Sequence, residues 1–273
     1  MDSDVPAWAL DADAAERNRL ATDWPHEVTR EWAWGGSDGA GVRVCVVDSG
    51  VDAGHPLVGG VERAVAPVPG PDGEPVIGPD EAGDVSGHGT ACAGIIRSLA
   101  PRCSLTSARV LGPDLGGSAA DQLAGLAWAI DEGFDVVNLS LSTRKRAVVP
   151  ELHELADRAY FRGTLLVACA HNLPVESFPW RFSSVLSVAG HAGADPYEVH
   201  CNGAPPVEFY ARGVDVEVAW AGGETITATG NSFATPHLAG LCARILGAHP
   251  GLTPFQVKHL LYLTATNVER VAA

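Results

Sequence analysis

Three residue types that cooperate in nucleophilic catalysis stand at well-separated points of the chain. Asp48 follows the apolar run 42–47, His88 lies between two glycines, and Ser232 opens a predicted helix. Each alone has an ordinary structural explanation, as a turn Asp, a hydrogen-bonded structural His or a helix N-cap. Together they can act as one unit, because a serine hydroxyl becomes nucleophilic when an imidazole takes its proton and a carboxylate fixes the imidazole tautomer. We therefore predict acyl transfer through Ser232.

The order and surroundings of these residues carry a family resemblance. The chain order Asp, His, Ser is the one that subtilisin uses, whereas an α/β-hydrolase has a G-x-S-x-G motif and the order Ser, Asp, His. Segments 46–52, 87–94 and 230–237 resemble the signature motifs of the subtilisin-like serine proteases (subtilase family, peptidase S8), and the similarity runs from about Val42 to about Gly247. The resemblance implies a serine endopeptidase that hydrolyses peptide bonds through a Ser acyl-enzyme.

The resemblance also implies a role for each matching residue. Asp48 would orient His88, which would act as general base toward Ser232 and then as general acid toward the leaving amine. Residues 165–172 look like the family strand that ends in the oxyanion-hole Asn, which makes Asn172 the oxyanion donor. Residues 137–142 resemble the strand that pairs with an extended substrate. The predicted substrate-binding residues are Ser140, Leu141, Ser142 and His171.

Several positions depart from the family pattern. The usual Thr before the nucleophile is Asn231, the usual Met after it is Phe233, and the usual Pro of Ala-Pro-Gly is Arg212. His171 and Ser142 stand where the family has glycines that leave room in the S1 pocket. An imidazole and a hydroxymethyl group should narrow or repolarise that pocket. This predicts a restricted-specificity processing protease, for example one that cleaves a precursor or leader peptide.

Cys92 lies four residues after His88 and matches the cysteine beside the active-site His in the proteinase K-like branch of the family. This match implies sensitivity to mercurials rather than a thiol mechanism, because a buried apolar thiol has a raised pKa. The six cysteines show no CxxC pair or metal-ligand spacing. With no export signal visible, and with Cys45 and Cys169 inside apolar runs, reduced thiols are expected.

The sequence predicts no metal and no cofactor. The strong calcium site of many subtilisins is expected to be absent, because Leu57 follows His55-Pro56 in place of an Asp and the helix 89–99 has no room for the inserted loop. Acidic residues elsewhere could bind calcium, but solvated loop acids are the simpler interpretation. These acids are Asp72, Asp80 and Asp84.

Strands and helices alternate around the candidate residues. The pattern predicts an α/β fold, a three-layer subtilisin-like arrangement with a mostly parallel central sheet and helices on both faces. Strands are expected at 42–47, 104–110, 136–141, 164–170 and 185–189, and helices at 89–99, after Ser118, at 151–161, at 232–246 and after Thr253. The Pro- and Gly-rich segment 66–83 is predicted to be a surface loop. Asp48 and Asn172 both follow strands, which places them at the carboxyl edge of the sheet, where such sheets bind ligands.

Length and composition fit one enzyme domain. The 273 residues, 46% of them hydrophobic, suffice for a full core. We divide the chain into an N-terminal acidic segment, residues 1–24, and a peptidase domain, residues 25–273. The net charge of −15 argues against nucleic acid or an anionic membrane as partner, and no secretory signal or membrane-length apolar run is visible. We expect a cytoplasmic monomer that acts on a peptide or protein.

Two other functions stay open. The first is a catalytically silent peptide-binding module on the same fold, which the changes at Asn231, His171 and Arg212 favour. The presence of all three triad residues and of Asn172 argues against it. The second is a peptide ligase or macrocyclase, which would use the same triad with an amine in place of water, and nothing in the sequence separates it from a protease.

Overall fold

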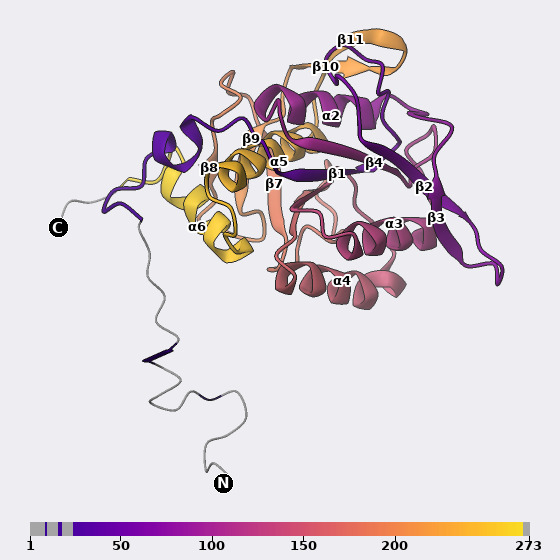
Figure 1. Ribbon diagram of the computed structural model, residues 1–273, viewed down its shortest axis with the longest axis horizontal. Coiled ribbons are helices and arrows are strands. Elements are labelled where there is room, and N and C mark those ends of the chain that lie inside the picture. Colours follow the sequence, from indigo (N-terminus) through magenta and orange to yellow (C-terminus); the bar gives the residue numbers. More distant parts are fainter. Residues whose placement is uncertain (1–8, 10–15, 18–23, 270–273) are drawn as a thin grey trace.

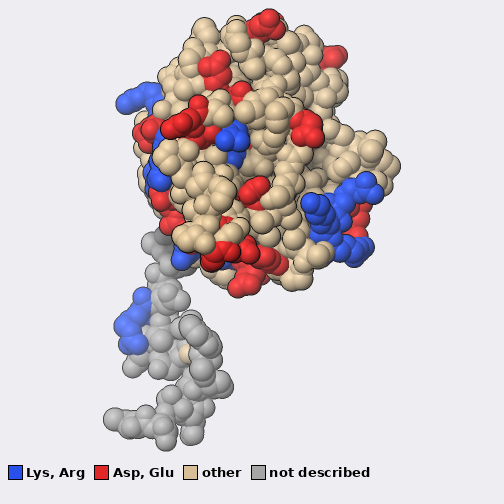
Figure 2. Space-filling view, turned by 90° about the vertical axis from the view of Figure 1, so that its right-hand side faces the viewer, with Lys and Arg blue, Asp and Glu red and all other residues tan. Residues whose placement is uncertain are grey.

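The computed structural model describes residue 9, residues 16–17 and residues 24–269. The predicted acidic segment, residues 1–24, therefore lies largely outside the described residues. The remainder forms a central sheet with helices on both faces (Figure 1), as predicted. Within the described ranges, no helix has the length and apolar character needed to cross a bilayer. Figure 2 shows acidic and basic side chains interspersed on one face, so the excess negative charge does not form a continuous field there.

The main sheet has nine strands in the order β3-β2-β4-β1-β5-β6-β7-β9-β8. Its centre consists of parallel strands at the predicted places, although the strand expected at 136–141 ends two residues early. These strands are β1 (Arg43–Asp48), β4 (Ser104–Arg109), β5 (Val136–Leu139), β6 (Leu165–Cys169) and β7 (Leu186–His191). Beyond β7 follow β9 (Phe209–Arg212), which is parallel to it, and the short antiparallel edge strand β8 (His200–Cys201).

The prediction of a surface loop at 66–83 is wrong. β2 (Arg63–Pro69) and β3 (Pro75–Pro79) form an antiparallel hairpin at one edge of the sheet. Proline lacks an N–H group and is tolerated in edge strands. β2 pairs with β4 only over Arg63–Val65, before its prolines begin, and β3 has a neighbour on one side only. The prolines that suggested a loop are therefore compatible with an edge hairpin.

Helices cover both faces of the sheet (Figure 1). One face carries α3 (Ala119–Asp131) and α4 (Val149–Phe161), and the opposite face carries α2 (His88–Leu99), α5 (Asn231–Ala248) and α6 (Pro254–Thr264). Side-chain caps begin two of these helices at the predicted places: Ser118 accepts a hydrogen bond from the Asp121 N–H, and Thr253 and Gln256 form a capping box. A separate antiparallel hairpin, β10 (Val216–Trp220) with β11 (Glu224–Ala228), packs near α2.

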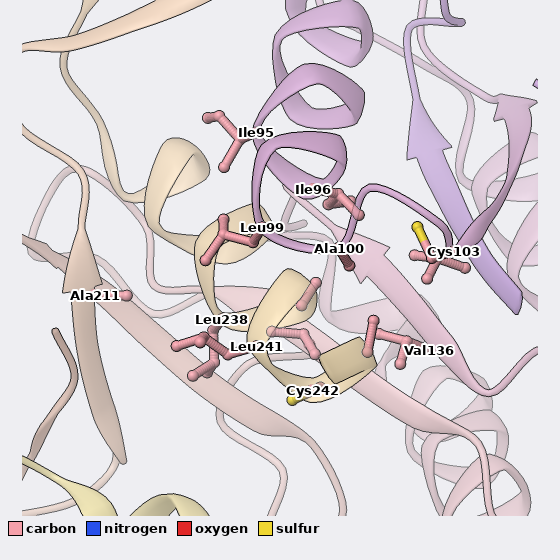
Figure 3. Close-up of a cluster of buried hydrophobic side chains, with 14 of the residues drawn as sticks. Ile95, Ile96, Leu99, Ala100, Cys103, Val136, Ala211, Leu238, Leu241 and Cys242 are labelled. Atoms are coloured by element: carbon pink, nitrogen blue, oxygen red, sulfur yellow. The ribbon is translucent and has the colours of Figure 1, made fainter. Parts of the chain in front are cut away.

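Alternation along β1 divides the core between the two faces. Val44 and Val46 belong to the cluster under α2 and α5, whereas Cys45 and Val47 belong to the cluster under α3 and α4. In Figure 3, Ile96 and Leu99 of α2 lie beside Leu238 and Leu241 of α5. The two helices approach closely, because a Cβ added at Gly240 would lie 2.9 Å from the Leu99 Cβ. This contact holds the end of α2 against the middle of α5.

Candidate active site

Asp48, His88 and Ser232 come together from three elements. Asp48 is the last residue of β1, His88 is the first residue of α2, and Ser232 is the second residue of α5. Asp48 is completely buried, His88 is 6% exposed and Ser232 is half-buried. A cleft of about 240 Å³ is lined by His88 and Ser232 together with Asn172. His88 and Ser232 therefore face the same cleft, and Asp48 is buried against His88.

The contact between Asp48 and His88 fixes the imidazole tautomer. His88 Nδ1 lies 2.8 Å from Asp48 Oδ1, and the Ser49 N–H donates to the same oxygen at 2.8 Å. An ionised carboxylate only accepts hydrogen bonds, so Nδ1 must carry the proton. The neutral ring then has its lone pair on Nε2, which is the form a general base needs.

The same contact changes the acidity of the imidazole. Burial disfavours the charged ring and lowers the pKa of His88, but the charge and hydrogen bond of Asp48 and the charge of Asp84 raise it. The raising effects prevail, and the pKa lies above the usual 6.5. A base with a raised pKa accepts a proton more readily, provided that the pH keeps it neutral at the start of the reaction.

The prediction that the acidic residues of this region are solvated loop acids is wrong for Asp84. Its carboxylate accepts hydrogen bonds from the Ser49 hydroxyl at 2.8 Å and from the Thr90 N–H at 2.8 Å, as well as from three more donors around the start of α2. The same prediction is wrong for Asp80, because its side chain is fully buried and pairs with Arg109 at 2.9 Å. The place of Asp84 just before a helix was the available signal, since an Asp there can accept from first-turn N–H groups.

Ser140 holds the backbone of Ser232. Its hydroxyl donates to the Ser232 carbonyl oxygen at 2.8 Å and accepts from Asn138 Nδ2 at 3.1 Å. The side chain is thus committed to the first turn of α5, although Ser140 also lines the cleft. Phe233 packs its ring 5.5 Å from that of His88, centroid to centroid. Nothing in the structure explains Arg212.

Asn172 faces the space next to the nucleophile. Its Oδ1 accepts the Asn231 N–H at 2.9 Å, which leaves Nδ2 available as a donor. A Cβ added at Gly230 would lie 3.5 Å from Asn172 Nδ2 and 3.2 Å from Ser232 Oγ, so both atoms border one small volume. A donor amide beside a serine hydroxyl is the arrangement that stabilises a tetrahedral oxyanion.

The other predicted substrate-binding residues line the same cleft. Leu141, Ser142 and His171 are all half-buried there. The Leu173 N–H donates to His171 Nδ1 at 3.0 Å, so a neutral His171 carries its proton on Nε2. Among the described residues that line the cleft, none is Asp, Glu, Lys or Arg. The cleft therefore combines polar and apolar groups without an acidic or basic side chain of fixed charge.

Cys92 contacts the carboxylate of Asp48. Its sulfur is 3.8 Å from Asp48 Oδ2 and 3.3 Å from Ser140 Oγ, and the residue is completely buried. Burial, followed by the charge of Asp48, raises the pKa of the thiol well above 9.0. A thiol that stays protonated is a weak nucleophile, so this position suits packing rather than covalent catalysis.

A cluster of potential metal ligands lies outside the residues that line the cleft. His191, Glu198 and His200 bring their ligand atoms within 4.8 Å of one another. Both nitrogens of His191 are already engaged, since Nε2 is 3.0 Å from the Glu198 carbonyl oxygen and Nδ1 accepts the Gly193 N–H at 2.9 Å. His200 Nε2 is 2.9 Å from Glu198 Oε1. The ring nitrogens that could bind a metal are thus engaged in hydrogen bonds.

Residues 39–273 match the profile of the Subtilase family. The chain belongs to this family. It is 31% identical over 242 residues to a thermostable alkaline protease of Halalkalibacterium halodurans, covering 84% of this chain and 63% of that protein's length. It is 30% identical to subtilisin DY of Bacillus licheniformis, covering 85% and 86%. This subtilase also resembles the crystal structure of a cold adapted subtilisin-like serine proteinase, with a TM-score of 0.69 and 28% identity over 82% of each chain.

These comparisons confirm the family and the fold class that the sequence predicted. The protein is a subtilisin-like serine endopeptidase, so its substrates are proteins or peptides. The geometry provides each step with a candidate group: a base whose tautomer is fixed, a serine at a helix start and an amide beside it.

Proposed function

We propose that this subtilase is a restricted-specificity processing endopeptidase whose S1 pocket favours a small or polar P1 side chain. The observation that carries the proposal is that His171 and Ser142 line the same cleft as Ser232 and Asn172. Both residues replace glycines that the family resemblance leads one to expect there. They take up space, and each adds a hydrogen-bonding group.

These two side chains favour a substrate P1 side chain that can accept a hydrogen bond. His171 has its Nδ1 lone pair occupied by the Leu173 N–H, so the neutral ring offers Nε2–H as a donor. Ser142 offers a hydroxyl that can donate or accept. A large apolar P1 group would bury these polar groups without partners, at a cost of about 1–3 kcal/mol. That cost corresponds to a factor of roughly 5–150 in kcat/KM against such substrates.

The test is digestion of a peptide library randomised at P1, with cleavage rates read by mass spectrometry. The wild-type enzyme should cleave peptides with P1 Ser, Asn or Gln faster than those with P1 Phe or Leu. His171→Gly and Ser142→Gly should each narrow that gap, because they restore space and remove a polar group. Near-equal cleavage of all P1 residues by the wild type would refute restricted specificity.

We further propose a reducing, cytoplasmic location, which the cysteines support. All six are unpaired and five of them are buried. Unpaired thiols in this number are typical of proteins in reducing compartments. Fractionation of the source cells with antibody detection would test the proposal, and recovery of the protein outside the cytoplasm would contradict it.

A further inference from the structure

Asn231, the residue before the nucleophile, connects three segments of the active site. Its Oδ1 accepts the Gly190 N–H of β7 at 2.8 Å. Its Nδ2 donates to the carbonyl oxygens of Ala170 at 3.2 Å and His171 at 3.3 Å. One N–H and two carbonyl groups surround the amide, so its orientation is unambiguous.

The backbone of Asn231 completes the connection. Its N–H donates to Asn172 Oδ1 at 2.9 Å. The side chain thus holds the two residues that immediately precede Asn172, while the main chain holds the side chain of Asn172 itself. Three of these four hydrogen bonds end within residues 170–172. Asn231 therefore controls both the backbone position and the rotation of the Asn172 amide.

We propose that Asn231 is a positioning residue that acts through Asn172: it holds the oxyanion donor in place relative to Ser232. The threonine that usually stands here carries a single hydroxyl with one proton to donate. It cannot donate to two carbonyl groups while accepting from Gly190. In this chain the Asn side chain ties the oxyanion segment to the helix that carries the nucleophile.

The loss of kcat expected for an Asn231 variant cannot exceed the loss that follows removal of the oxyanion donor itself. Removal of that donor in subtilisin lowers kcat by about 10²–10³. Asn231→Ala keeps the backbone bond to Asn172 and should lose less, about 10–100-fold in kcat. KM should change by less than about 3-fold, because a transition-state interaction is lost rather than ground-state binding. Hydrolysis of p-nitrophenyl acetate measures both constants without requiring any P1 side chain.

A double-mutant cycle distinguishes positioning from general damage. If Asn231 acts through Asn172, then adding Asn231→Ala to Asn172→Ala should lower kcat by less than about 3-fold further. Additive losses, or an unchanged kcat in Asn231→Ala alone, would overturn the proposal. Should Asn231→Ala fail to fold, the same cycle is run with Asn231→Thr, which keeps a hydroxyl, and the same criterion applies: its loss of kcat should largely disappear in the Asn172→Ala background.

Asn202 provides a matched control. In the loop between β8 and β9, its Nδ2 donates to the Ala204 and Val207 carbonyl oxygens, each at 2.9 Å, and its Oδ1 accepts the Ala204 N–H at 3.1 Å. Asn202→Ala removes a similar set of bonds at the sheet edge and should lower Tm without changing kcat. An equal loss of kcat in this variant would show that the effect of Asn231→Ala is general destabilisation.

Discussion

Gly230 sits where an added methyl group should lower activity severely without unfolding the protein. It precedes α5 with φ 168° and ψ 155°, an extended conformation that alanine can adopt. An added Cβ would lie 3.2 Å from Ser232 Oγ, 3.5 Å from Asn172 Nδ2 and 3.6 Å from a ring carbon of Phe233. The shortest of these contacts requires the serine hydroxyl to give by only a few tenths of an ångström. Gly230→Ala should therefore fold.

The size of the loss in kcat/KM follows from the space that the added methyl group takes from the substrate oxyanion. A substrate oxyanion must come within about 2.7–3.1 Å of its donor, whereas a methyl carbon keeps other heavy atoms at about 3.5–4.0 Å. Both cannot occupy the volume between Asn172 Nδ2 and Ser232 Oγ. The loss should equal or exceed that of the donor itself, about 10²–10³ in kcat/KM or about 2.7–4 kcal/mol. Stability should change by no more than about 1 kcal/mol, because Gly→Ala also restricts the unfolded chain.

The assay combines p-nitrophenyl acetate hydrolysis with thermal unfolding of the same samples. Gly203→Ala is the control, since a Cβ at Gly203 has no heavy atom within 4 Å and the site is exposed. It should keep full activity. A Gly230→Ala enzyme with near wild-type kcat/KM would refute the reasoning, because Ser232 and Asn172 could not then share the oxyanion volume.

Three more predictions follow from the surroundings of the site. Because the pKa of His88 is raised and the base must be neutral, kcat/KM should fall as the pH drops through a midpoint above 6.5, and Asp84→Asn should move that midpoint to lower pH in a pH–rate profile. Iodoacetamide should modify at most Cys201 in the native protein and all six cysteines in denaturant, counted by intact mass; modification of a buried thiol under native conditions would contradict the packing. A fluorophosphonate probe should add once to the wild type and not to Ser232→Ala, and an adduct on the variant would point to another nucleophile.

The sequence predicted the interior of the fold better than its edges. Central strands such as β1 and β6 are apolar runs buried on both sides, and their composition alone indicates them. The edge hairpin of β2 and β3 was missed because its prolines are acceptable only where one side of a strand is unpaired. Pairing with a distant segment decides that condition, and local composition does not report it.

The candidate site also has a part that the sequence predicts and a part that it does not. Asp48, His88 and Ser232 stand in short motifs that can be recognised without knowing the fold. The interactions that support them join residues far apart in the chain: Asp84 accepts from Ser49, 35 residues away, and Ser140 donates to Ser232, 92 residues away. The place of Asp84 before a helix hints at a capping role, but no local pattern encodes which distant residue pairs with it or with Ser140, so these pairings could be assigned only from the structure.

The arrangement of the two helices explains why the supporting groups matter. His88 begins α2 and Ser232 lies at the start of α5, and these helices pack against each other along their length through contacts such as Gly240 on Leu99. Helix packing therefore sets the distance between base and nucleophile, whereas Asn172 lies beyond the end of β6 and belongs to neither helix. Its alignment needs a separate connection to α5. The bonds of Asn231 to residues 170–172 supply that connection, which is why a change at this one position should affect the oxyanion donor more than the Asp48–His88 pair.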